Sequence, residues 1–289
     1  MKLRLGIHLL ILLAYGTVQA QQLKLIELDA TYDHDKYNTQ PKDIVREFRA
    51  YTVSFDGKDD DNGDGQADYW RVPEWVSYEI KAMAAPEKGP KRPSKWITDK
   101  ELHAQGVCAT DDTYKYSQEF RKTHPNWYAR GHMCMKLIAW RNGAYADWNT
   151  HTLLNACPQR EHNNAGIWLD MEKKTIAWAN KYGSVWVICG PVFNGQTPSS
   201  FIGEPEKGEL QVAVPDAFFK IVVREGTTPE KPEVLAFIYP QDTERKDKEH
   251  GKYLVSVDEV EKRTGLDFFM SLSFEAQRVI EGDVAVGIW

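Results

Sequence analysis

The residues of this sequence that could do chemistry lie close together, between Trp127 and Glu172. If the segment that ends at Glu172 is helical, Asn164, Trp168 and Glu172 occupy positions i, i+4 and i+8, so an amide, an indole and a carboxylate share one face. Such a face can present an oxygen ligand to a metal ion. His132 precedes this segment, and an imidazole titrates near neutral pH and can take a proton from water.

Apolar runs around this segment predict the elements that would hold it. Residues 152–154 and 185–188 flank the predicted helix, and both runs are typical of buried strands. A strand carrying the histidine would then face a helix carrying the oxygen ligand. Further core strands are predicted at residues 73–83, 212–223 and 234–240.

Five short patterns occur in one order along the chain. They are an Arg-Gly-His triplet (130–132), an Asn-x-x-Pro-Gln turn (155–159), an Asn-x-Gly-x-Trp segment (164–168), Glu172, and a Gly-Pro-Val-Phe run (190–193). Together these patterns resemble the DNA/RNA non-specific endonuclease family, which are ββα-metal nucleases of the endonuclease G type. The resemblance extends roughly from Trp75 to Phe269, because residues 73–78 and 264–269 are similar to the flanks of the family.

The resemblance implies an α+β fold. It predicts a ββα-metal (His-Me finger) nuclease core, built on a central, mainly antiparallel β-sheet flanked by helices. Residues 1–20 are predicted to be a signal peptide, residues 21–72 an N-terminal extension, and residues 73–289 a single endonuclease domain. We find no internal repeat that would indicate a second domain.

The resemblance also assigns roles to the residues of the site. Hydrolysis of a phosphodiester needs an activated water, a Lewis acid, and cations that neutralise charge at phosphorus. His132 would be the general base, and Asn164 would be the sole direct protein ligand to Mg²⁺ or Mn²⁺. Glu172 would hold metal-bound water, Asn155 would orient the catalytic groups, and Arg130 would neutralise phosphate. The neighbouring Asn163 is a weaker candidate ligand in this register, and Trp168 is expected to pack in the core.

Two features around the catalytic motif bear on binding of the substrate. The family usually has Asp before the Arg-Gly-His triplet, whereas this chain has Ala129, so the carboxylate neighbour of Arg130 is missing. The segment at residues 88–96 carries four basic residues and a tryptophan, a composition that suits contact with phosphate. Arg92 is the candidate for that contact, and a plain solvated loop is the alternative.

An acidic loop at residues 56–68 offers oxygen side chains at alternate positions around a glycine turn. Its candidate ligands for Ca²⁺ are Asp60, Asn62, Asp64 and Asp68. The loop is not an EF-hand, because Arg71 stands where the bidentate Glu would be required. A solvated acidic loop without an ion is the alternative interpretation.

The first 20 residues combine Lys2 and Arg4, an apolar run from Leu5 to Tyr15, and a small-residue site at Ala20. This pattern is typical of a cleaved signal peptide, because the apolar run is too short to span a bilayer. It predicts a secreted or periplasmic protein that does not reside in the membrane. The net charge of −6 argues against coating nucleic acid by bulk charge, but it is compatible with an enzyme that has a local basic groove.

The four cysteines of an exported chain are expected to form disulfides rather than free thiols. Cys157 and Cys189 each follow a predicted core strand, so they are either a bonded pair or inert buried thiols. A zinc cluster is a further reading, although the spacings match no tight ligand pattern. It would draw on His103, Cys108, His124, Cys134, His151 and His162.

These features predict an exported, sugar-non-specific endonuclease that cleaves DNA and RNA with weak sequence preference. A mechanism that activates solvent water does not use a 2′-OH, and contacts to phosphate carry no base information. The alternative is a nuclease-fold protein that binds polynucleotides with weak or no turnover. The intact His132, Asn164 and Glu172 favour the enzyme, and Ala129 faintly favours the binding protein.

Overall fold

The computed structural model describes residues 28–37, 43–58, 60, 63, 65, 68–84, 92–93, 95–143 and 146–289. The predicted signal peptide lies outside the described residues. Asn62 and Asp64, two of the four candidate calcium ligands, also lie outside them, so the predicted calcium loop stays a prediction.

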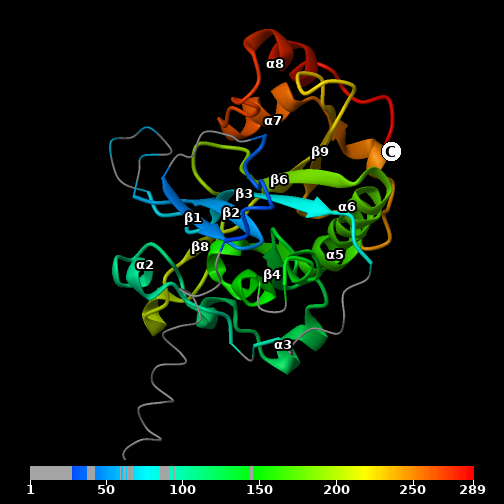
Figure 1. The fold of residues 1–289 in the computed structure, drawn as a ribbon. Coiled ribbons are helices and arrows are strands. Elements are labelled where there is room, and N and C mark those ends of the chain that lie inside the picture. The colour runs from blue at the N-terminus through cyan, green and yellow to red at the C-terminus, as the bar shows by residue number, and fades with distance from the viewer. Residues whose placement is uncertain are drawn as a thin grey trace, which may run out of the picture.

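A seven-stranded sheet with the order β1-β2-β3-β6-β9-β10-β11 forms the centre of the molecule (Figure 1). Every neighbouring pair in this sheet is antiparallel, which confirms the central antiparallel sheet. The strands are β1 (Ile44–Phe48), β2 (Tyr51–Phe55), β3 (Pro73–Lys81), β6 (Ser184–Val192), β9 (Ala217–Arg224), β10 (Glu233–Pro240) and β11 (Leu254–Val255). Because β1 pairs with β2 and β2 pairs with β3, the sheet continues across the predicted boundary between residues 72 and 73.

The central strands are buried on both faces, which explains why they read as almost continuous apolar runs. Along β9, Phe218 and Val222 pack into one hydrophobic cluster, whereas Phe219 and Ile221 pack into a second cluster on the other side. Lys220 interrupts this run, and its side chain is fully buried. The runs predicted as core strands at residues 73–83, 185–188, 212–223 and 234–240 are confirmed in their main parts.

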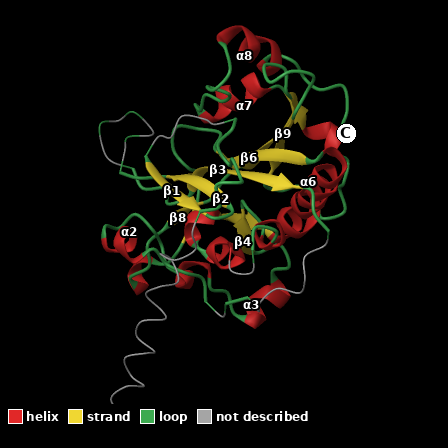
Figure 2. Cartoon of the chain, viewed as in Figure 1, coloured by secondary structure: helices red, strands yellow, loops and turns green. Residues whose placement is uncertain are grey.

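Helices cover both faces of the sheet (Figures 1 and 2). On one face, α6 (Leu169–Tyr182) packs against β3 and β6. On the other face, α7 (Val257–Thr264) packs against β10 and β6, and α8 (Phe274–Glu281) lies against α7. The shorter α-helices are α2 (Lys100–Ala104), α3 (Gln118–Thr123), α4 (Lys136–Trp140) and α5 (Glu161–Asn163).

A second, two-stranded antiparallel sheet lies on the α6 face and is formed by β4 (Tyr128–His132) and β5 (Ala156–Arg160). The strand predicted at residues 152–154 is therefore wrong, because the chain forms a 3₁₀ turn over Leu153–Asn155 before β5 begins. Thr152 caps this turn by accepting a hydrogen bond from the backbone N–H of Leu154. The threonine hydroxyl thus offers the backbone a local partner that competes with strand pairing.

The four cysteines are free thiols in the structure, and all four are buried. The expectation of disulfides is therefore wrong, and the inert buried thiol is the correct reading for Cys157 and Cys189. Burial raises the pKa of the Cys189 thiol to about 12, so the thiolate is scarce at neutral pH. Within the described residues, the cysteines and histidines considered for a zinc cluster form no group of three.

Among the described residues, no helix combines the length and the apolar character needed to cross a membrane.

Gly190, in the middle of β6, provides a test of how tightly the sheet is packed. A Cβ at this position would lie 2.3 Å from the carbonyl oxygen of Glu74 and 2.8 Å from the Phe219 ring. Gly190→Ala should therefore lower the free energy of unfolding by roughly 1–3 kcal/mol, measured by urea denaturation. Gly251→Ala is the control, because a Cβ there meets nothing within 4 Å. Equal midpoints for the two variants would show that the sheet adapts without strain.

Candidate active site

The strands β4 and β5 hold His132 at the edge of their small sheet. His132 is the last residue of β4 and lies opposite Ala156 in the register. Gly131, just before it, has no room for a side chain, because a Cβ there would lie 2.3 Å from Gln159 Oε1. The glycine of the Arg-Gly-His triplet is therefore required by close packing of the two strands.

Asn155 fixes the backbone that follows His132. Its Oδ1 accepts a hydrogen bond from the Cys134 N–H at 2.8 Å. Its Nδ2 donates to the carbonyl oxygens of Cys134 at 2.9 Å and Thr150 at 3.0 Å. The side chain is fully buried and is absent from the lining of the pocket described below. The Asn155 side chain thus ties the backbone at Cys134, two residues after His132, to the backbone at Thr150.

The segment that carries Asn164 is a π-helical turn, η4 (Asn164–Trp168), which leads into α6. Gly166 has non-helical angles (φ −102°, ψ −115°), so the regular period assumed for the predicted helix is broken there. Such π-helical turns are frequent at functional sites. Asn164 and Glu172 still line one pocket, but Trp168 does not join them and is buried in the core. The shared face predicted for the three side chains is therefore wrong for Trp168, whereas its expected packing in the core is confirmed.

The two neighbouring asparagines have different surroundings. Asn163 is fully buried, accepts a hydrogen bond from Gln159 Nε2 at 2.8 Å, and donates to the carbonyl oxygen of Pro240 at 2.7 Å. Asn164 is partly exposed, lines the pocket, and makes no side-chain hydrogen bond to the described part of the chain. The side chain of Asn163 thus makes hydrogen bonds within the protein, whereas the amide oxygen of Asn164 is available to a ligand.

A pocket of about 530 Å³ opens between the small sheet and the start of α6. It brings together five predicted site residues that are far apart in sequence, namely Arg92, Arg130, His132, Asn164 and Glu172. The pocket is also lined by Trp96, Trp127, Lys136, Trp140 and Glu161. Asp60 and Asp68, the two candidate calcium ligands that the structure describes, are not among its lining residues.

His132 is held neutral by its surroundings. Burial lowers its pKa well below 6.5, and the nearby His151, Arg92 and Arg130 lower this pKa further. Its Nε2 is buried and has no hydrogen-bond partner among the described residues. The ring packs against Trp96 at a centroid distance of 4.6 Å. An unprotonated imidazole with an unused nitrogen can serve as a base.

A second histidine lies beside the first. His151 is buried, and its ring is perpendicular to that of His132 at a centroid distance of 5.2 Å. Burial lowers the pKa of His151 to about 4, so this ring is also neutral at pH 7. Its Nδ1 lies 3.0 Å from the carbonyl oxygen of Asp147 and must donate to it, because a carbonyl can only accept. His151 Nε2 is then the lone-pair nitrogen.

Arg130 is oriented by a carboxylate from elsewhere in the chain. Its Nε lies 2.7 Å from Asp111 Oδ1, and both side chains are mostly buried. Asp111 begins the 3₁₀ turn η1 (Asp111–Tyr114), far from Arg130 in sequence. Ala129 removes the neighbouring carboxylate that is usual in the family, but Arg130 still has an acidic partner.

Glu172 lies at the bottom of the pocket and is only 4% exposed. Burial raises the pKa of its carboxyl group to about 7, although the nearby Lys220 and Lys173 oppose this rise. Glu172 Oε1 has no hydrogen-bond partner among the described residues. The carboxylate therefore has an oxygen ready for a cation or for water bound to one.

Lys220 lies behind the pocket and is fully buried on β9. Its Nζ has no hydrogen-bond partner among the described residues and sits 3.6 Å from the centroid of the Trp168 ring. The Trp168 Nε1 in turn donates to the carbonyl oxygen of His132 at 3.0 Å. A buried cation, an indole and the backbone of the candidate base therefore form one continuous contact.

The sequence analysis did not identify Asp111 or Lys220, and it considered His151 only as a possible zinc ligand. A signal for Lys220 was present, because a lysine flanked by Phe219 and Ile221 stands out in a core strand. The four-residue spacing between His151 and Asn155 gave only a weak signal, and Asp111 had no local signal at all.

The donors in the pocket fit a hard divalent cation. Asn164 offers an amide oxygen and Glu172 a buried carboxylate oxygen, and among the described lining residues His132 is the only histidine. Oxygen donors of this kind suit Mg²⁺ or Mn²⁺ better than Zn²⁺, which prefers nitrogen and sulfur.

Known proteins are similar to this chain in sequence and in fold. The family model described as DNA/RNA non-specific endonuclease matches residues 33–275. A nuclease of Serratia marcescens is 28% identical over 216 residues, covering 73% of this chain and 74% of that protein. A nuclease of Nostoc sp. is 30% identical over 220 residues, covering 73% of this chain and 71% of that protein.

Mitochondrial relatives are longer than the matched region. Mitochondrial nuclease EXOG of Xenopus laevis is 28% identical over 211 residues, which are 70% of this chain but 54% of that protein. The chain thus spans about half the length of that relative. A solved structure of an EndoG/EndoGI complex contains a chain with the same fold, at a TM-score of 0.61 and 24% identity over 83% of this chain and 91% of that one.

The family match covers most of the chain, including both strands of the small sheet and the whole pocket segment, and we conclude that the chain belongs to the DNA/RNA non-specific endonuclease family.

Proposed function

We propose that this protein is a metal-dependent endonuclease that hydrolyses phosphodiester bonds in DNA and RNA. The observation that carries the proposal is the single pocket that joins His132, Asn164 and Glu172 with the guanidinium groups of Arg92 and Arg130. Neutral imidazole, hard oxygen donors and fixed cations are the three components that attack on a phosphodiester needs. Membership of the family supports the same conclusion.

In the proposed mechanism, His132 takes a proton from a water molecule whose oxygen attacks phosphorus. The scissile P–O bond then breaks, and the leaving sugar oxygen takes up a proton from solvent to depart as an alcohol. The lowered pKa keeps the imidazole unprotonated and ready to accept this proton at pH 7. Asn164 would hold a divalent ion, with Glu172 binding water in its outer shell; the ion would act as a Lewis acid on the phosphate. Arg130, fixed by Asp111, would neutralise charge that develops on the phosphate oxygens.

The same pocket supports action on both kinds of nucleic acid. Its charged residues suit contacts with phosphate, which DNA and RNA share and which carry no base information. Water as the nucleophile makes the 2′-OH unnecessary. The substrate is therefore proposed to be either polymer, cleaved internally with weak sequence preference.

A catalytically weak binding protein is the alternative function, and it would be favoured by the loss of the family Asp at Ala129. The Asp111 partner of Arg130 argues against it, because the guanidinium keeps a carboxylate that orients it. We further propose that the protein is exported through residues 1–20.

Digestion of matched single- and double-stranded DNA and RNA tests the function. With Mg²⁺ both polymers should be cut internally, EDTA should stop cleavage, and rising salt should slow it as phosphate contacts are screened. His132→Ala should lower turnover by roughly 10²–10⁴-fold because the proton acceptor is lost.

His124→Ala is the matched control for this assay, since His124 is exposed and lies outside the pocket. Circular dichroism should show the same fold in both variants. Wild-type cleavage by a folded His132→Ala protein, or products from one sugar type alone, would contradict the proposal.

Arg92→Ala should change both binding and the pH profile. Loss of a charged phosphate contact should raise KM by roughly 10-fold. Because Arg92 helps to lower the pKa of His132, its removal should raise that pKa and move the acidic limb of the kcat profile to higher pH. Lys95→Ala is the control from the same basic segment and should shift neither quantity, since Lys95 does not line the pocket. An unchanged acidic limb in Arg92→Ala would show that Arg92 does not influence the pKa of His132.

Glu172→Gln should alter how stability depends on pH. The carboxyl pKa is about 7 in the folded protein against an ordinary value of 4.5, so between these pH values the folded state holds a proton that the unfolded state releases. Stability should therefore fall as pH rises through this window, by at most on the order of 3 kcal/mol from this group.

Glutamine does not titrate, so the variant should lose less stability between pH 5 and pH 8 in urea denaturation with EDTA. Glu281 also has its pKa raised to about 7, but its contribution is present in both proteins and cancels in the comparison. Parallel stability curves for wild type and variant would contradict the assignment. With Mg²⁺, Glu172→Gln should also lower activity by roughly 10–100-fold.

A further inference from the structure

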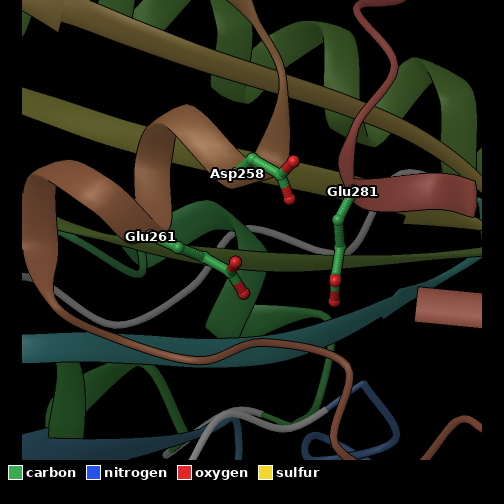
Figure 3. Close-up of side chains that lie close together, drawn as sticks. All are labelled: Asp258, Glu261 and Glu281. Carbon is green, nitrogen blue, oxygen red and sulfur yellow. The ribbon is translucent and has the colours of Figure 1, made fainter. Parts of the chain in front are cut away.

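Three carboxylates converge between α7 and α8, on the opposite face of the sheet from the pocket (Figure 3). Asp258 and Glu261 lie one turn apart on α7, and Glu281 is the last residue of α8. One oxygen from each of the three lies within 4.8 Å of the others. The side chains come from two helices and surround a common space.

Among the described residues, none of the three carboxylates forms an ion pair with a lysine, arginine or histidine. The basic residues of the same helices have other partners: Lys262 pairs with Glu259, Arg278 pairs with Glu275, and Arg263 donates to Asn194. Three like charges at this separation repel one another.

Glu281 distinguishes this group from an ordinary acidic surface. The residue is only 8% exposed, and its Oε1 is buried with no hydrogen-bond partner among the described residues. Burial, followed by the charges of Glu261 and Asp258, raises its pKa to about 7. A buried polar atom without a partner is rare in native proteins and calls for a ligand or a proton. The adjacent Asp283, by contrast, is exposed.

We propose that Asp258, Glu261 and Glu281 bind a calcium ion that links α7 to α8. Ca²⁺ accepts six to eight oxygen ligands in flexible geometry, so three carboxylates supplemented by water or carbonyl oxygens suit it. Mg²⁺ demands a stricter octahedron, and Zn²⁺ prefers nitrogen and sulfur. Glu261 Oε1 accepts a hydrogen bond from the Phe268 N–H at 2.9 Å, which orients this carboxylate.

This calcium site is independent of the proposed catalysis. It lies across the sheet from His132, and none of its residues lines the candidate active pocket. The family match ends at residue 275, so Glu281 belongs to a part of the chain beyond the matched region. The bound ion would attach the C-terminal helix to the nuclease domain.

Calcium titration of the full-length protein tests this site. Protein stripped with EDTA and then saturated with CaCl₂ at pH 8 should gain about 5 °C or more in Tm, because the ion binds only the folded state. Glu281→Gln should abolish most of this gain and weaken calcium binding by at least 10-fold in calorimetry. Asp258→Asn should act in the same direction, which guards against a folding defect peculiar to one variant.

Two controls isolate the proposed site. Asp283→Asn removes a charge from the same segment and should keep the full calcium response. An Asp60→Asn, Asp68→Asn double variant should also keep it, which excludes the acidic loop as the source. A calcium response that survives in Glu281→Gln and Asp258→Asn would overturn the proposal. A rise in the Tm of calcium-free protein on Glu281→Gln, without any calcium response in the wild type, would overturn it in favour of proton sharing.

Discussion

The hydrogen bond from Trp168 Nε1 to the carbonyl oxygen of His132 joins the two elements on which the candidate site depends. The strand β4 brings the histidine, and the turn that begins at Asn164 brings the oxygen ligand, but neither element determines where the other lies. The Trp168 indole links the two elements, because it bonds directly to the backbone of His132, the residue that would act as the base. The Trp168 side chain is itself only 1% exposed, so the core holds the donor in place.

Lys220 extends this connection into the main sheet. Its ammonium group lies over the Trp168 ring and close enough to Glu172 to oppose the rise in that carboxyl pKa. Burying a lysine without a hydrogen-bond partner is costly. The cation contributes a positive field behind the pocket, which favours the charged form of Glu172. The sheet therefore supplies electrostatics to the site as well as support.

Much of the fold was predictable because its signals are local. The apolar runs of β3, β6, β9 and β10 predicted that these strands are buried. The spacing of the motifs from Asn155 to Glu172 predicted a candidate active site. The errors arose where local chemistry or distant partners decided the outcome. The hydroxyl of Thr152 replaced a predicted strand with a turn, and Gly166 broke the regular helical period that was assumed from Asn164 to Glu172. Asp111 reaches Arg130 only through the fold, so no pattern near Arg130 could reveal it.

The four free cysteines determine how the protein responds to oxidising and reducing surroundings. Cys134, Cys157 and Cys189 all pack in the same core cluster as small apolar side chains, with raised thiol pKa values. Reagents that attack thiolates therefore find little reactive cysteine in the folded molecule. Because the chain has no disulfide to reduce and little thiolate to oxidise, its cysteines keep the same covalent state in reducing glutathione and in air. Folding of this chain therefore needs neither a thiol oxidase nor a disulfide isomerase.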